Sequence, residues 1–166
     1  TFAALQEVVP YIEITIPVEP PFEIDNDNNF IYGLTEGMAP EDFEALCAGI
    51  IVGNGRLEIT PTPNGFGTGT KVELIDNANE EVVGTWYIVI FGDVNGDGIA
   101  GAIDADLINN FENFAVEWDP IAEFYLFIAG DLDANGIVEA MDGDMISNAE
   151  NFVMWIDQWT GLAYAY

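Results

Sequence analysis

The chain has 166 residues, of which 30 are acidic and 2 are basic, so its formal net charge is −28 at neutral pH. With Arg56 and Lys71 as its cations, its surface cannot neutralise phosphates, which argues against binding to nucleic acid or anionic membranes. The lack of histidine excludes imidazole acid–base catalysis and histidine metal sites. Half of the residues are hydrophobic and 13% are aromatic, so the chain should fold and not behave as a disordered acidic tail.

The length allows one ordinary domain or two small ones. Cys47 is the single cysteine and lies in an apolar stretch, so we expect it to be a buried small hydrophobic residue. No apolar run reaches the roughly 18 residues of a membrane-spanning helix. The chain begins with Thr1, and we expect a mature chain or a piece of a longer one.

Residues 1–21 join an apolar stretch to an alternating segment and a proline-rich stretch. Isoleucines alternate with other residues from 11 to 16, which predicts a β-strand. One interpretation is that this is the first strand of the chain's own β-rich domain. The other is that residues 1–18 complete the sheet of a neighbouring copy, with the proline-rich stretch as a hinge. Repeated head to tail, that contact would make a filament.

Residues 22–91 are predicted to be mostly β-structure. Pro40 followed by two acidic residues predicts a short helix over 40–48, because proline suits the first turn and acids suit the positive end of the helix dipole. Strands are expected over 57–60, 70–75 and 81–91, with the last two joined as a hairpin. The run 86–91 is almost wholly apolar, which predicts a central strand covered on both faces.

The second half contains an internal repeat with an offset of 38 residues: 92–114 aligns with 130–152, and 12 of 23 positions are identical. Such a repeat marks a duplicated unit, here a Gly/Asp/Asn-rich loop followed by an amphipathic helix. Phe114 and Phe152 continue the apolar stripes of the two helices, which favours a place in the core. The alternative is that they form, with Ile103 and Met141, a flat apolar patch that binds another molecule. Between the units, Asp119 is a good N-cap and predicts another helix to about residue 128.

The repeated loops place oxygen side chains at the spacing of an EF-hand-type calcium loop. In the loop that begins at Asp93, such side chains occupy positions 1, 3, 5 and 12, with glycine at position 6 and isoleucine at position 7. A hard cation takes about six to eight oxygens, and glycine permits the sharp bend. The loop that begins at Asp131 has the same features.

Asp/Asn/Gly clusters also form ordinary turns, but two matches at the same phase of a repeat favour two Ca²⁺ ions. The expected ligands are Asp93, Asn95, Asp97, Ile99 and Asp104 in the first loop, and Asp131, Asp133, Asn135, Ile137 and Asp142 in the second. At position 9, we expect a water to serve the first loop and Glu139 to approach the ion in the second.

The duplication, the aspartate at position 12 and the strand that enters the first loop together resemble the dockerin family of cellulosomal assembly modules. The resemblance covers residues 92 to about 162 and rests on 92–98 and 130–136. It implies a non-catalytic, calcium-dependent, extracellular bacterial module that binds cohesin modules on a scaffold. Residues 30–91 more loosely resemble the small β-rich module that often precedes a dockerin.

The predicted fold class is α+β, with an N-terminal β-rich, sandwich-like domain followed by a small α-helical dockerin-like domain with two EF-hand-type calcium loops. The expected divisions are an arm and hinge at 1–21, a β-rich module at 22–91 and a dockerin-like module at 92–166. The resemblance implies partner contacts at loop positions 10 and 11 and helix positions 17, 18 and 22. These are Ala102, Ile103, Asn109, Asn110 and Phe114, and Ala140, Met141, Ser147, Asn148 and Phe152.

The sequence therefore predicts an extracellular calcium-binding assembly module with a cohesin-like partner, no nucleic acid and no membrane insertion. The alternative is a structural subunit of a self-assembling filament or pilus, in which residues 1–18 complement a neighbour. A carbohydrate-binding module that uses exposed tryptophans is a third hypothesis. An enzyme is not expected, because 30 acidic residues produce carboxylate pairs by chance.

Overall fold

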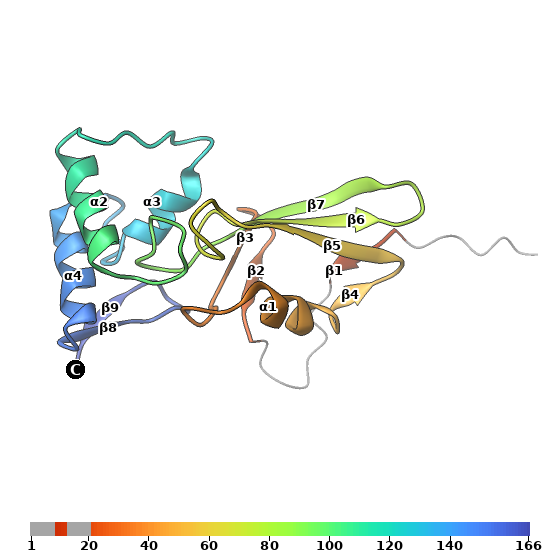
Figure 1. The fold of residues 1–166 in the computed structure, drawn as a ribbon, viewed down its shortest axis with the longest axis horizontal. Coiled ribbons are helices and arrows are strands. Elements are labelled where there is room, and N and C mark those ends of the chain that lie inside the picture. Colours follow the sequence, from red (N-terminus) through yellow and green to blue (C-terminus); the bar gives the residue numbers. More distant parts are fainter. Residues whose placement is uncertain (1–8, 13–20) are drawn as a thin grey trace, which may run out of the picture.

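The computed structural model describes residues 9–12 and 21–166. Its elements, shown in Figure 1, are β1 (Tyr11–Ile12), β2 (Glu23–Asp25), β3 (Phe30–Tyr32), α1 (Pro40–Cys47), β4 (Ile51–Val52), β5 (Gly55–Thr60), β6 (Lys71–Asp76), β7 (Glu81–Ile88), α2 (Ala102–Glu112), α3 (Phe124–Gly130), α4 (Ala140–Glu150), β8 (Met154–Ile156) and β9 (Ala163–Ala165). Strands dominate the first part and helices the second, which confirms the α+β prediction.

The N-terminal segment is described only in part. Tyr11–Ile12 pairs antiparallel with β4 of the same chain. The rest of the predicted strand, residues 13–16, lies outside the described residues, as do 1–8 and 17–20. The two interpretations of the arm therefore stay predictions.

A five-stranded sheet in the order β2-β3-β7-β6-β5 forms the first part of the molecule. β3 pairs with β7 in parallel, and the other pairs are antiparallel. The hairpin of β6 and β7 was expected, and β7 is the middle strand. Its apolar end explains this position, because Ile88 and the following Val89 and Ile90 are fully buried.

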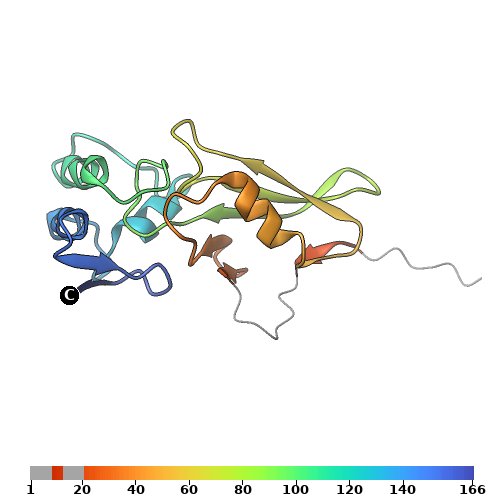
Figure 2. The ribbon, with the colours of Figure 1, turned by 60° about the horizontal axis from the view of Figure 1, so that its bottom comes forward.

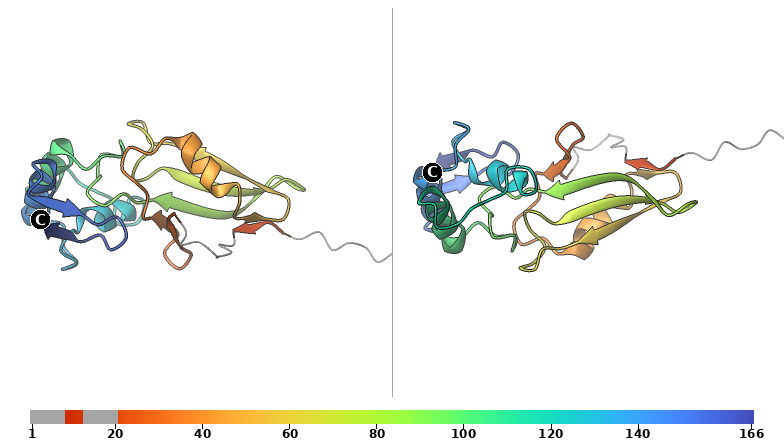
Figure 3. Two further views of the ribbon diagram at one scale, coloured as in Figure 1. Left: turned by 90° about the horizontal axis from the view of Figure 1, so that it is seen from below. Right: turned by 90° about the horizontal axis from the view of Figure 1, so that it is seen from above.

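Helix α1 lies across one face of this sheet (Figures 2 and 3). It begins at Pro40 as predicted, and its buried Phe43 and Cys47 join the apolar core of the sheet. The small β1–β4 pair contributes Ile12 and Ile51 to the same core. The layer over the sheet is thus a helix and a two-stranded pair, where a sandwich would have a second large sheet.

Helices α2, α3 and α4 gather at one end of the molecule, where α2 packs against α4 (Figure 1). Ile108 and Ile146 occupy equivalent positions of the repeat, and both are fully buried in the core between these helices. Phe30, Val89 and Phe91 from the β-rich part belong to the same core. The apolar core therefore runs across the expected division at residues 91 and 92.

The prediction that Phe114 and Phe152 lie in the core is wrong. Their side chains are 90% and 83% exposed, and their φ angles are +58°. In each case the helix has already ended: the amide of Phe114 donates to Phe111 O and that of Ala115 to Asn110 O, and the second repeat has the same pair of bonds. This is a Schellman motif, and the left-handed turn takes the phenylalanine off the apolar stripe.

Helix α3 begins later than predicted. The carboxylate of Asp119 accepts bonds from the amides of Ile121 and Ala122, as an N-cap would. The Glu123 carboxylate in turn accepts a bond from the Asp119 amide at 2.8 Å. Residues 120–123 form a turn, and the helix starts at Phe124.

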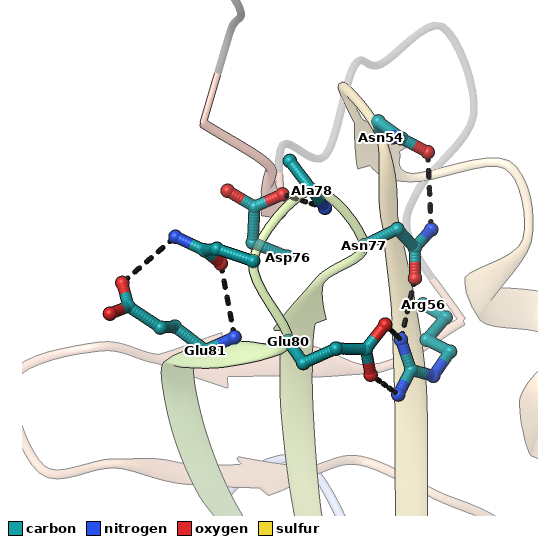
Figure 4. Close-up of polar contacts among 8 residues, drawn as sticks. Asn54, Arg56, Asp76, Asn77, Ala78, Glu80 and Glu81 are labelled. Atoms are coloured by element: carbon teal, nitrogen blue, oxygen red, sulfur yellow. Dashed lines mark hydrogen bonds and ion pairs between the residues drawn. The ribbon is translucent and has the colours of Figure 1, made fainter.

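Both cationic side chains are paired within the sheet. Arg56 contacts Glu80 at 2.6 Å and donates to Asn77 at 2.7 Å at the tip of the β6–β7 hairpin (Figure 4). Lys71 contacts Glu73 at 2.8 Å. Neither cation is therefore free to balance carboxylates at the helical end of the molecule.

Replacing Ile108 by alanine should lower the free energy of unfolding by about 2–5 kcal/mol, because the substitution leaves a cavity between α2 and α4. Ile121 is 86% exposed and is the matched control, for which we expect a change within about 0.5 kcal/mol. Urea unfolding with calcium present measures both. Equal effects of the two substitutions would contradict the placement of Ile108.

Candidate metal centres

The second repeated loop brings three carboxylates together. Oxygens of Asp131, Asp133 and Asp142, at loop positions 1, 3 and 12, all lie within 4.8 Å of one another. Among residues 9–12 and 21–166, these are the acidic side chains whose oxygens lie close enough together to hold one metal ion. The acids of the first loop do not form a second group of this kind. Three of the five ligands expected in the second loop, all of them carboxylates, are thus close together.

The aspartate at position 12 connects the two ends of each loop. Asp142 accepts bonds from the amides of Leu132 and Glu139, both at 2.9 Å. Asp104 does the same in the first loop, where it accepts from Val94, Asn95 and Gly101. Because each aspartate is also in the first turn of α2 or α4, the start of the helix and the start of the loop are held at one point.

The side chains at positions 3 and 5 follow one pattern in both loops. Asn95 accepts a bond from the Asp97 amide at 2.7 Å, and Asp133 accepts one from the Asn135 amide at 3.0 Å. Glycine at position 6 has a φ of +91° in the first loop and +85° in the second, so the bend needs a residue without a Cβ. These short-range bonds explain why the repeated sequence makes the same turn twice.

The first loop is buried against the β-rich part, whereas the second is open to solvent. Asp93 is fully buried and accepts three amide bonds, from Gly96, Gly98 and Thr68. The Thr68 bond, at 2.8 Å, comes from the loop between β5 and β6. Asp131 accepts bonds from its own loop, at Asn135 and Gly136.

Further hydrogen bonds join the β5–β6 loop to the first repeated loop. The Thr62 hydroxyl donates to Gly96 O at 2.7 Å, and the Asn64 amide group donates to Asn95 O at 2.6 Å. On another side of the same loop, the Ala100 amide donates to the Glu36 carboxylate at 3.1 Å. Sequence patterns do not indicate these contacts, since the partners are about thirty or more positions apart along the chain.

Burial disfavours the charged form of the loop carboxylates. It raises the pKa of Asp104 to about 6, against bonds from the Gly101, Val94 and Asn95 amides that lower it. Burial likewise raises the pKa values of Asp93 and Asp142. A bound cation would offset this cost, because it favours the deprotonated carboxylates that ligate it.

The donor set fits a hard cation such as calcium. The three grouped side chains of the second loop offer carboxylate oxygen alone, which suits Ca²⁺ or Mg²⁺ better than a softer metal. The Glu139 carboxylate is turned toward the loop and accepts a bond from the Asn135 side chain at 3.1 Å. Oxygen ligands, without histidine or cysteine, favour a hard cation over zinc or copper.

The residues expected to contact a partner are mostly at the surface. Ala102, Ile103, Asn110, Phe114, Met141, Asn148 and Phe152 are exposed, while Asn109, Ala140 and Ser147 are half-buried. The end of α2 meets the start of α4, where the Ala140 amide donates to Glu112 at 3.3 Å. Phe114 therefore lies toward the end of the helix pair that holds Met141, and Phe152 lies toward the end that holds Ile103.

The four tryptophans differ in how far they are buried. Trp86 and Trp118 are buried, and Trp118 stacks on Phe111 with ring centres 4.3 Å apart. Trp155 and Trp159 are partly exposed, at 42% and 47%. Trp155 stacks on Tyr164 and Trp159 packs on Gly33, so both are held by their own chain.

A scan against protein-family models, a search of curated proteins and a search of solved structures each returned no match to this chain. In the described part of the chain, no helix has the length and apolar character needed to cross a membrane.

Replacing Gly67 by alanine should lower Tm by several degrees. Its Cβ would overlap the Gly98 amide and the Asp93 carboxylate, and such overpacking costs about 1–3 kcal/mol. Gly49→Ala is the control, because a methyl group at Gly49 would meet no other described atom within 4 Å. Thermal unfolding followed by circular dichroism measures both, and an unchanged Tm for Gly67→Ala would refute the tight packing of the first loop.

Without calcium, the protein should become less stable as the pH rises from about 4 to about 6. The folded state holds protons on Asp93, Asp104 and Asp142 at pH values where the unfolded chain has released them, because their folded pKa values are raised. Urea unfolding in a chelator measures this slope, and Asp104→Asn should flatten it. A slope as steep in the variant as in the parent would contradict the role of Asp104.

Proposed function

We propose that this protein is a non-catalytic, calcium-stabilised assembly module of dockerin-like type that works outside the cell. The observation that carries the proposal is the group of three carboxylates in the second loop, at positions 1, 3 and 12 of a calcium-loop pattern. The repeat of that pattern before each of the two packed helices supports it, since calcium at both loops would fix the positions of α2 and α4.

Extracellular calcium suits this chemistry, because extracellular modules bind calcium with a Kd of about 10⁻⁴–10⁻³ M. The module's partner would be a protein, met by exposed residues at the two ends of the helix pair. A cohesin-like module is the partner that the dockerin resemblance implies.

Calorimetric titration of the intact protein with calcium tests the proposal. We expect two ions per chain and a rise in stability of about 2.7 kcal/mol for each site at 100 times its Kd. Asp131→Ala should remove one ion, while Asp144→Ala should remove none, because Asp144 is an exposed acid of α4 outside the loop. A chain that binds no calcium, and melts at the same temperature in chelator, would disprove the calcium assignment.

The two sites should release calcium at different rates. The first loop is covered by the β5–β6 loop and the second is open, so a chelator should remove the second ion first. Stopped-flow mixing with a fluorescent chelator measures the two phases, and Asp131→Ala should abolish the faster one. Loss of the slower phase in this variant would contradict the difference in burial.

Partner binding is tested separately, by mixing the calcium-loaded protein with a panel of purified cohesins and measuring binding by surface plasmon resonance. Light scattering and electron microscopy of the protein alone test the filament alternative. Binding to a cohesin supports the dockerin-like function, whereas filaments without cohesin binding would replace it with self-assembly.

A further inference from the structure

Each end of the α2–α4 pair has a surface cavity, and one of the two exposed phenylalanines lines each cavity. The cavity at Phe114 has a volume of about 390 Å³ and also includes Phe111 and Trp118. The cavity at Phe152 has a volume of about 300 Å³ and includes Trp155 and Tyr166. Both volumes are at the lower end of the range for ligand pockets, and both walls are rich in aromatic rings.

The two phenylalanines hold a backbone conformation that favours glycine. A φ of +58° at the residue after a helix costs a bulky side chain free energy that glycine would avoid. Packing does not explain the choice, since both side chains are almost fully exposed. The same residue at the same strained position in both repeats is better explained by a contact with another molecule.

Each cavity also has a carboxylate from the same position of the repeat. Glu112 lies two residues before Phe114 and lines its cavity, and Glu150 lies two residues before Phe152 and lines the other. A second glutamate accompanies each, Glu117 in the first cavity and Glu36 in the second. The chain's cations, Arg56 and Lys71, are paired within the sheet and line neither cavity.

We infer that these two cavities receive the basic side chains, arginine above all, of a partner protein. Aromatic rings bind the flat face of a guanidinium and the aliphatic stem, while the glutamates accept its hydrogen bonds. This inference rests on the proposed assembly function and names the chemistry of its partner: a surface with exposed basic residues.

The net charge of the chain favours a different protein over a second copy of this chain as the partner that fills the cavities. Two copies of the chain would each bring a net charge of −28 and two cations that are already paired. A second copy would therefore have to give up one of these pairs to place a basic side chain in either cavity, and its own acidic surface would oppose the contact. A basic partner would instead gain from the field of the whole protein, which steers cations toward it.

The test is an NMR titration of the calcium-loaded protein with the blocked peptide Leu-Arg-Leu at about 150 mM salt, where distant charges are screened. The control peptide has citrulline in place of arginine, which keeps the shape and removes the charge. We expect saturable shifts at Phe114, Phe152 and Trp118, and at least tenfold weaker binding of the citrulline peptide. Equal binding of the two peptides, or shifts spread over the acidic surface, would overturn the inference.

Glycine substitutions separate binding from folding. Phe114→Gly and Phe152→Gly should keep or raise Tm, because they relieve the positive φ, and should each weaken peptide binding about tenfold at the altered cavity. Asn29→Gly is the control, since Asn29 has a φ of +62° and lines neither cavity. Unchanged peptide affinity in both phenylalanine variants would refute the role of the rings.

A charge-matched pair tests the carboxylates. Glu112→Gln should weaken binding at the Phe114 cavity several-fold, while Asp144→Asn, the same change of charge on exposed α4 surface, should not. Equal loss in both would mean general attraction to an acidic protein and would overturn the inference.

The outcomes for calcium and for the peptide separate this inference from the proposed function. If the protein binds calcium in calorimetry but does not bind the arginine peptide, the inference alone fails. If the protein does not bind calcium, the proposed function fails.

Discussion

The buried carboxylate of Asp93 is the contact on which the arrangement of this molecule depends. Asp93 lies two residues after the apolar run that ends at Phe91, and it begins the first repeated loop. Its carboxylate accepts amide bonds from both that loop and Thr68 of the β-rich part. A buried carboxylate is costly unless its oxygens are satisfied, so the loop and the sheet must stay together for either to be stable. The contacts of Thr62 and Asn64 with the same loop strengthen this connection.

The first loop, held to the β-rich part by Asp93, in turn positions the helix pair and the second loop. Asp104 and Asp142 each join a loop start to a helix start, and the buried Ile108 and Ile146 then hold α2 against α4. Both helices end in the same left-handed turn, which carries Phe114 and Phe152 outward. The two units of the internal repeat therefore share three structural features: the loop, the buried isoleucine at the contact between the helices, and the exposed phenylalanine after the helix.

The strong acidity of the chain has two physical consequences. Close carboxylates in the second loop repel one another, which makes a cation the natural way to stabilise them. Exposed acids elsewhere disfavour contact between copies, and they favour a partner that supplies positive charge. Calcium within the loops and basic residues at the helix ends would meet these two needs separately.

Local pattern in the sequence was enough to predict the helix at Pro40, the β6–β7 hairpin, the central strand and the two loops with their helices. These depend on spacing, turn residues and apolar runs over a few positions. The burial of the first loop depended instead on contacts such as Thr68 with Asp93, far apart along the chain. The stripe of apolar residues likewise predicted buried phenylalanines, but a left-handed turn at the end of each helix, which helical periodicity does not encode, exposed them.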